Sequence, residues 1–217
     1  MTDVPKLVEA IKQARESSKR KFKQTFDLVI NLKDLDLKKP EQQVDFFIQL
    51  PHGRGKINKI AGLIGPEMID EAKANLDFFI LQDDFDKWTA KPKARKLAED
   101  YDFFIAQATI MTKVASAFGR VFGVRGRMPN PKAGCVVPPK ASLKALVERL
   151  KTMIRVQAKT QPIIQVPLGT EDMKDEQIAE NADAVLKQLL NTLVTGKQNI
   201  KNAVIKTTMG APVKIEV

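Results

Sequence analysis

The side chains that most often do chemistry in proteins are scarce in this chain. His52 is the only histidine and Cys135 is the only cysteine. A zinc site built from Cys and His cannot form, a Cys–His catalytic pair is not expected, and a Ser–His–Asp triad would depend entirely on His52. Because Gly53 follows it, His52 is better interpreted as a turn residue than as a base. We therefore predict no enzyme activity, no metal and no cofactor.

Glycine-rich segments offer a second route to chemistry, the binding of phosphate groups. "GRVFGVRG" (119–126) has neither the glycine spacing of a dinucleotide-binding loop nor the Gly-Lys-Ser/Thr ending of a nucleotide phosphate loop. "HGRGK" (52–56) is followed by Ile57 where that ending needs Ser or Thr. One acidic segment is expected to be a solvated loop with nothing to perturb its carboxylates: Asp83, Asp84 and Asp86. A nucleotide-handling enzyme therefore remains only an alternative, which binding of a nucleotide to the isolated middle segment would test.

Composition points to association with a polyanion. The chain has 217 residues, of which 43% are hydrophobic and 29% charged, so it can bury a sizeable core. Its net charge of +10 favours a partner such as nucleic acid. A single cysteine rules out a disulfide within the chain and suits a reducing compartment. No signal-type or membrane-length apolar segment is present in the sequence, so we expect a soluble intracellular protein.

The secondary-structure elements that must position any site follow two different sequence patterns. In the terminal parts, helices and alternating strands predict an α+β unit. The expected elements are a helix at 5–16, strands at 26–32, 44–50 and 163–169, a long helix at 176–194, and closing strands at 201–210 and 211–217. In the middle, short apolar strands alternate with helices, which is typical of a parallel sheet covered by helices. These strands are expected at 59–64, 77–81 and 102–106, and the helices at 66–75, 92–100, 109–118 and 141–151. We predict a discontinuous α+β domain of residues 1–58 and 151–217, with a Rossmann-like α/β domain of residues 59–150 inserted into it.

One run, "GRVFGVRGRMPNPKAG" (119–134), is too rich in Gly and Pro for a helix or a plain strand and predicts tight turns. It could be a linker, a phosphate cradle or a shaped surface for a polyanion. No acidic residue lies between Asp102 and Glu148, whereas seven basic residues do: Lys113, Arg120, Arg125, Arg127, Lys132, Lys140 and Lys144. A second basic cluster leads into the first strand: Lys19, Arg20, Lys21 and Lys23. Basic runs beside turns fit phosphate contacts better than an ordinary solvated face.

Two short segments could contact nucleic acid directly. Phe22 lies beside the second basic cluster, where an aromatic ring could stack on a base. It is also in phase with Phe26 and Leu28, so it could instead pack inward. "KTTMG" (206–210) offers two hydroxyls and a glycine that allows close approach of another backbone, or it could be a strand end with an ordinary turn. Neither a GXXG loop nor the aromatic pair of RNA-recognition motifs is present in the sequence.

Four segments together resemble one family. "FKQTFDL" (22–28), "LPHGRGK" (50–56), "GVRGRMPNPKAG" (123–134) and "TTMG" (207–210) occur in the order seen in the universal L-one family of large-subunit ribosomal proteins, in its archaeal branch. The resemblance covers essentially the whole chain. It implies a first domain built from both termini and an inserted Rossmann-like domain. It also implies binding to ribosomal RNA of the mobile stalk beside the tRNA exit site, help with release of deacylated tRNA, and, in many members, repression of their own messenger RNA. The expected partners are thus RNAs, and no association with a membrane is expected. The protein is expected in the cytoplasm, on the ribosome, and as a monomer when it is outside the ribosome.

The resemblance also implies which residues contact RNA. On the first domain they match Lys21, Phe22, Thr25, Asp27, Thr208, Met209 and Gly210, with Gln24 and Thr207 beside them. Asn202 stands where family members often have Ser. The run at 119–134 becomes a basic turn element of the second domain whose RNA contacts are secondary: Arg125, Arg127 and Lys132. Val124 and Cys135 replace a common Pro and Thr near this element, which puts its details in question.

Overall fold

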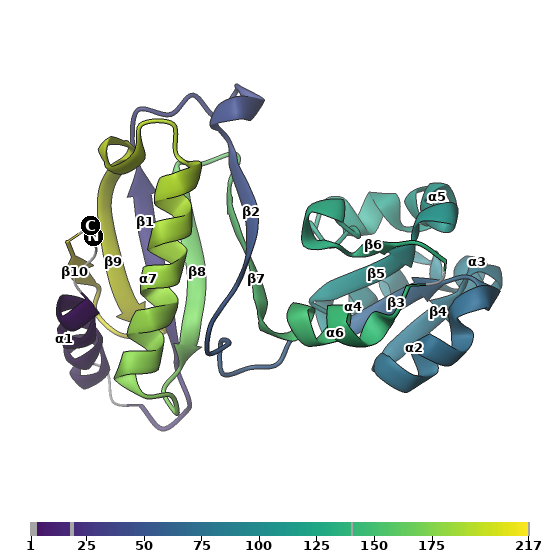
Figure 1. The fold of residues 1–217 in the computed structure, drawn as a ribbon, viewed down its shortest axis with the longest axis horizontal. Helices are drawn as coiled ribbons and strands as arrows, with labels where there is room; N and C mark the ends of the chain where they lie inside the picture. Colours follow the sequence, from purple (N-terminus) through teal and green to yellow (C-terminus); the bar gives the residue numbers. More distant parts are fainter. Residues whose placement is uncertain (1–3, 18–19, 140, 217) are drawn as a thin grey trace. The chain divides into compact units, whose positions relative to one another are not determined.

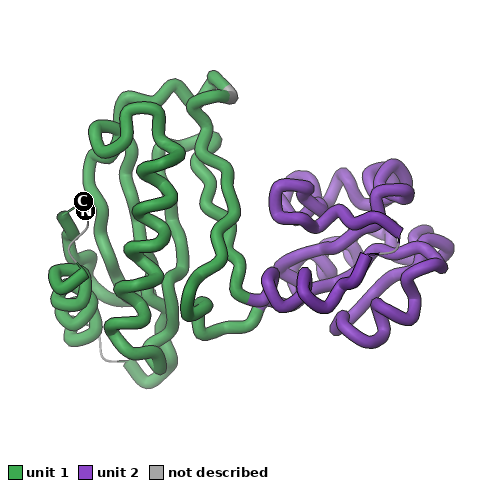
Figure 2. The backbone as a smooth tube through the Cα atoms, viewed as in Figure 1, with its two compact units in different colours: residues 1–57, 152–217 green, residues 58–151 purple. Residues whose placement is uncertain are grey.

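The computed structural model describes residues 4–17, 20–139 and 141–216, and the chain divides into two compact units (Figure 2). Unit 1 consists of residues 1–57 and 152–217, and unit 2 of residues 58–151. The chain therefore passes from one unit to the other at two places. Each unit has its own cluster of buried apolar side chains, and the two clusters share no residue.

Unit 1 contains an antiparallel sheet in the strand order β10–β9–β1–β8. Its strands are β1 (Thr25–Leu32), β8 (Ile163–Thr170), β9 (Ile200–Thr207) and β10 (Val213–Ile215). Two helices, α1 (Val4–Glu16) and α7 (Asp175–Thr192), bury their apolar faces in the same cluster as the strands, and α7 lies across the sheet in Figure 1. On the other face of β1 the side chains are half-buried. That face is not sealed, so it can carry polar groups.

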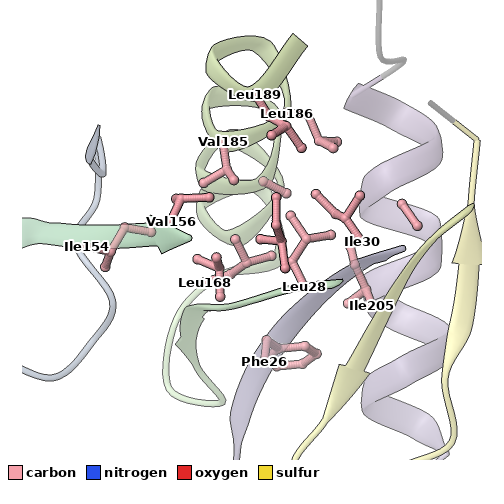
Figure 3. Packing of buried hydrophobic residues seen from close by; sticks show 14 of the residues in the cluster. Phe26, Leu28, Ile30, Ile154, Val156, Leu168, Val185, Leu186, Leu189 and Ile205 are labelled. Carbon is pink, nitrogen blue, oxygen red and sulfur yellow. The ribbon is translucent and has the colours of Figure 1, made fainter. Parts of the chain in front are cut away.

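The alternation in β1 shows why this segment is a strand. Phe26, Leu28 and Ile30 are fully buried, while the residues between them are half-buried. Figure 3 shows these three side chains in one buried cluster with Val185 and Leu186 of α7. Full burial of such a side chain stabilises a fold by about 1.5–3 kcal/mol. A period of two with one buried face therefore fixes both the strand and its register.

A two-stranded ribbon completes unit 1. It pairs β2 (Val44–Gln49) with β7 (Met153–Ala158) in antiparallel register. Asp45 on β2 receives a bidentate hydrogen bond from Arg155, at 2.9 and 3.1 Å, and an ion pair from Lys159 at 2.8 Å. Burial alone would raise the pKa of Asp45, but the bonds from Arg155 and Lys159 outweigh it and lower the pKa to about 2. The carboxylate thus stays charged and ties the two strands together.

Unit 2 contains a parallel sheet in the strand order β4–β3–β5–β6. Its strands are β3 (Ile60–Ile64), β4 (Phe78–Leu81), β5 (Phe103–Gln107) and β6 (Val136–Val137), and its main helices are α2 (Ile69–Asn75), α4 (Lys91–Asp100), α5 (Met111–Phe122) and α6 (Leu143–Thr152). Every residue of β3 is buried, as expected for a central parallel strand covered on both faces. The predicted mixed α/β and α+β fold class is confirmed.

Two predictions about local structure were wrong. Residues 119–122, placed in the non-helical run, form the last turn of α5. Phe118 and Phe122 stack with ring centroids 5.1 Å apart, and Phe122 lies 4.4 Å from Phe104, so aromatic burial at i and i+4 outweighs the helix-weakening Gly119. The acidic segment is helical rather than a loop: η3 (Gln82–Asp84) is followed by α3 (Phe85–Trp88), because Phe85 is buried against Phe118.

Candidate nucleic-acid interface

Three strands of unit 1 bring hydroxyl side chains together at one end of the sheet. Thr25 begins β1, Thr170 ends β8, and Thr207 ends β9. Thr25 pairs with Thr170, and the neighbouring Phe26 pairs with Thr207. Thr208 follows β9 directly. We call this group, Thr25, Thr170, Thr207 and Thr208, the threonine end of the sheet.

A buried glutamine holds the segments of the threonine end in place. The side chain of Gln24 is only 1% exposed. Its Nε2 donates to Glu171 Oε1 at 3.0 Å, and its Oε1 accepts from the amide of Met209 at 3.0 Å. The backbone of Gln24 adds two bonds to Glu171, one from Gln24 N to Oε2 at 3.1 Å and one from Glu171 N to the Gln24 carbonyl at 3.0 Å. Gln24 therefore connects the start of β1 with the segments that follow β8 and β9. It positions neighbouring groups and does not offer its own side chain to a ligand.

The hydroxyl of Thr208 is partly engaged within the protein. Its Oγ1 accepts from the amide of Thr25 at 3.1 Å and donates to the carbonyl of Thr25 at 3.3 Å. A hydroxyl has one proton and two lone pairs, so Thr208 keeps one acceptor site for a ligand. Thr207 Oγ1 is buried and has no hydrogen-bond partner among the described residues. The Thr207 carbonyl accepts from the amide of Gly210 at 3.1 Å, which closes the turn that carries Met209.

Apolar and cationic side chains stand exposed beside this turn. Phe22 is 52% exposed and Met209 is 60% exposed, both large values for apolar residues. The alternative that Phe22 packs inward is thus wrong: β1 begins only at Thr25, so Phe22 lies before the strand whose alternate residues are buried. Lys21 is exposed as well. Lys23 forms an ion pair with Asp172 at 2.8 Å, and this hydrogen bond raises the pKa of Lys23.

One carboxylate lies on the open face of the sheet. Asp27 of β1 stands opposite Lys206 of β9. Partial burial raises the pKa of Asp27, and the nearby Lys206 charge opposes that rise. A carboxylate here can accept hydrogen bonds from sugar hydroxyls or base amino groups.

Asn202 lies apart from the threonine end. It pairs with Asn31 near the other end of β1 and β9, and its Oδ1 accepts from Asn31 Nδ2 at 2.5 Å. Asn31 lies six residue steps along β1 from Thr25, which is about 20 Å along a strand. Both amides border a shallow hollow of about 330 Å³ that Lys201 also lines.

The secondary basic loop is largely neutralised within unit 2. Arg125 forms an ion pair with Glu99 at 2.8 Å. Arg127 donates to the carbonyl of Asp102 at 2.6 Å and lies 3.5 Å from its carboxylate. Lys132 is exposed, and its amide donates to the side chain of Asn130 at 2.9 Å. Lys19 and Lys140, two other predicted basic positions, lie outside the described residues.

The two departures near this loop have different surroundings. Val124 is 89% exposed in the turn after α5. Cys135 is buried, and burial raises the pKa of its thiol to about 11. A thiol with that pKa stays protonated near neutral pH, so Cys135 is a packing residue and not a nucleophile.

No catalytic arrangement emerges from the described ranges. His52 Nε2 lies 2.5 Å from Glu180 Oε2 on an exposed turn. No group of three or more His, Cys, Asp or Glu residues that could hold a metal ion is found within residues 4–17, 20–139 and 141–216. Over the same ranges, no helix has the length and apolar character needed to cross a lipid bilayer.

Sequence reasoning missed two residues of this arrangement. Glu171 was not singled out, although it fixes Gln24 through three hydrogen bonds. Lys206, which stands opposite Asp27, was noted only within "KTTMG". Both lie at strand ends far from residue 24 along the chain. Only the register of β1 with β8 and β9 would have revealed them.

Comparison with known proteins agrees with this picture. A model of the Ribosomal protein L1p/L10e family matches residues 14–211. "Large ribosomal subunit protein uL1" of Thermococcus kodakarensis is 45% identical over 99% of this chain and 98% of its own length. The proteins of the same name from Nanoarchaeum equitans and Pyrococcus horikoshii are 43% and 42% identical, over 96% and 99% of this chain and 98% and 97% of their own lengths.

The fold and these matches define a ribosomal protein, which is a structural class of protein and not a class of enzyme. More narrowly, the chain belongs to the Ribosomal protein L1p/L10e family. The resemblance predicted from the four sequence segments is confirmed.

Proposed function

We propose that this protein is a constituent of the large ribosomal subunit that binds the ribosomal RNA of the mobile stalk through the threonine end of unit 1. The observation that carries the proposal is the exposure of Phe22 and Met209 beside a turn that buried Gln24 holds in place. Exposed aromatic and apolar groups on a fixed backbone suit stacking on unpaired bases. Lys21 adds a cation for phosphate.

The polar groups at this end suit the sugar as well. Thr208 keeps one acceptor lone pair, and the carboxylate of Asp27 is a further acceptor on the half-buried face of β1. An RNA 2′-hydroxyl can donate to either group, whereas DNA offers no such donor. The buried Gln24 and Thr207 take positioning roles in this proposal, because neither side chain reaches solvent.

The amide pair of Asn31 and Asn202 would contact a more distant part of the same RNA, since it lies at the other end of the strands. Arg125, Arg127 and Lys132 would give weaker, secondary contacts, because the two arginines are already paired with acids. In this proposal the protein acts as a monomer outside the ribosome.

Two further roles follow from family membership and form part of the proposal. On the stalk, the protein would assist release of deacylated tRNA from the exit site. The same threonine end would bind an operator in the protein's own messenger RNA and repress its translation. Footprinting on total cellular RNA tests both targets of the threonine end: protection of the ribosomal stalk without any protected site in the message would overturn the repressor role.

RNA affinity should have a part that depends on salt and a specific part that persists at moderate salt. Because a basic protein releases counterions from RNA, affinity should fall steeply as salt rises, with a slope of about −0.7 per phosphate contact on single strands. The stacking and hydroxyl contacts should leave a preference for the stalk RNA at moderate salt. Titration of the stalk transcript, an unrelated RNA and the corresponding DNA measures this. Equal affinity for all three at moderate salt would show that the site is not specific.

Thr208→Val is expected to weaken binding of the stalk RNA by roughly ten- to a hundredfold, as for a lost hydrogen bond at a desolvated site. The change keeps the volume and β-branching of Thr208 but removes the acceptor and both bonds to Thr25. Stability should fall by only about 1 kcal/mol, since these bonds are exposed. Thr208→Ser keeps the hydroxyl and should bind like the parent.

The matched charge control lies in unit 2. Lys144 is exposed on α6, and Lys144→Ala should alter RNA affinity little. Thermal melts of all variants check folding. If Thr208→Val binds like the parent while Lys144→Ala loses most affinity, the recognition site does not lie at the threonine end.

A further inference from the structure

The segment that follows β2, up to residue 57, contains backbone conformations that few residue types adopt. Gly53 and Gly55 both adopt left-handed conformations, with φ of 64° and 73°. A Cβ on Gly55 would lie only 2.3 Å from Thr170 Oγ1. We call residues 53–57 the glycine loop. Its two glycines let the backbone lie directly against Thr170, and therefore against the threonine end.

A buried amide fixes this loop to α7. Asn181 is fully buried, and its Oδ1 accepts from the amide of His52 at 3.2 Å. Its Nδ2 donates to the carbonyls of Gly53, at 2.7 Å, and Leu168, at 2.8 Å. The base of the glycine loop is thus held in one conformation, which reduces the entropy that a ligand must remove on binding.

The tip of the loop presents unsatisfied donors. Among the described residues, the amides of Gly55, Lys56 and Ile57 donate no hydrogen bond, and Thr170 Oγ1 has no partner. Gly55 and Lys56 are exposed, and Ile57 is 70% exposed. Successive backbone amides next to a turn form a concavity that suits an anion.

The charges around the loop favour an anion as well. Arg54 and Lys56 belong to the loop itself. Three acids that contact His52 or follow Thr170 accept hydrogen bonds within the protein: Glu180 from His52, Glu171 from Gln24, and Asp172 from Lys23. A phosphate at the tip of the loop would therefore meet the loop's own cations and backbone amides.

We propose that the glycine loop binds a backbone phosphate of the same ribosomal RNA that occupies the threonine end. Thr208 contacts Thr25, Thr25 pairs with Thr170, and Thr170 touches Gly55, so the groups form a continuous row. From Thr208 to Thr170 this row crosses two strand spacings, or about 10 Å. A single RNA strand can follow it. The inference rests on the proposed RNA binding at the threonine end.

Lys56→Ala and Lys56→Glu test this inference in the full chain, with Lys144→Ala as the matched control. Lys144 is an exposed lysine on α6 and belongs to none of the proposed RNA contacts. We expect Lys56→Ala to lower affinity for the stalk transcript by roughly three- to tenfold and to reduce the salt slope by about 0.7. Lys56→Glu should lower it further, and the control should match the parent.

A second readout follows the backbone directly. Amide resonances of Gly55, Lys56 and Ile57 should shift when the stalk transcript is added, and far less with inorganic phosphate at equal phosphate concentration. A parent protein that shows no preference for the transcript would defeat the proposed function itself. A parent that binds while both Lys56 variants match the control and the three amides stay unmoved would overturn only the loop inference. Saturable shifts with inorganic phosphate alone would assign the loop to a free anion and overturn its assignment to RNA.

Discussion

A chain reduced to unit 1, with residues 57 and 152 joined by a short Gly-rich linker, is expected to fold and to bind the stalk RNA almost as tightly as the full protein. All buried side chains of its core, from α1, α7, the sheet and the β2–β7 ribbon, belong to unit 1. The two ends to be joined lie close together, because the residues next to them are hydrogen-bonded: the amide of Asn58 donates to the carbonyl of Lys151 at 3.4 Å. The threonine end and the glycine loop both remain intact in this shortened chain.

Residues 58–151 alone should fold around their own aromatic core. Their affinity for the RNA should be lower than that of the full chain by a factor of about 10³ or more, which is the usual gap between specific and non-specific nucleic-acid binding. Titration of both pieces against the stalk transcript, with thermal melts, measures the division. Tight and specific binding by residues 58–151 would move the primary site to Arg125, Arg127 and Lys132.

Elements with a clear period could be predicted from the sequence. The alternation from Phe26 to Leu32 gave β1 because one face is buried and the other is not. The change to short apolar strands gave the parallel sheet of unit 2. The end of α5 could not be predicted, since the stacking of Phe118 and Phe122 on Phe104 depends on a strand that is distant in sequence. Local propensity at Gly119 points the other way.

The candidate site was predictable in part. Residue types identified Phe22 and the hydroxyls of "TTMG" as groups that could meet RNA, and the structure shows Phe22 exposed. The sequence could not show that Gln24 is buried, since its partners lie 147 and 185 residues away. Likewise, nothing near "HGRGK" predicts that Asn181 holds it, at a separation of 128 residues from Gly53. Such groups are found only through register and packing.

Gln24→Leu is expected to be the most damaging single change at the threonine end. It leaves the amide of Met209 and Oε1 of Glu171 without the side chain that satisfies them. A buried group left unpaired costs about 1–3 kcal/mol, and because both of these groups are only part-buried the lower half of that range applies, so the unfolding free energy should fall by about 2–4 kcal/mol. For a chain of this size that lowers Tm by roughly 5–15 °C. Gln188→Leu, on the exposed side of α7, replaces a solvated glutamine and should change stability by less than about 0.5 kcal/mol.

The same change should also weaken RNA binding below its melting temperature, because the turn that carries Met209 loses its anchor to β1. Affinity for the stalk RNA should fall at least as far as in Thr208→Val, since both Thr208 and Met209 depend on the position of that turn. Hydrogen exchange separates the two effects: the Met209 amide should lose protection in Gln24→Leu while the amides within α7 keep theirs. If the Met209 amide stays protected and affinity is unchanged, Gln24 stabilises unit 1 without positioning the turn, and the turn must be held by its own Gly210–Thr207 bond.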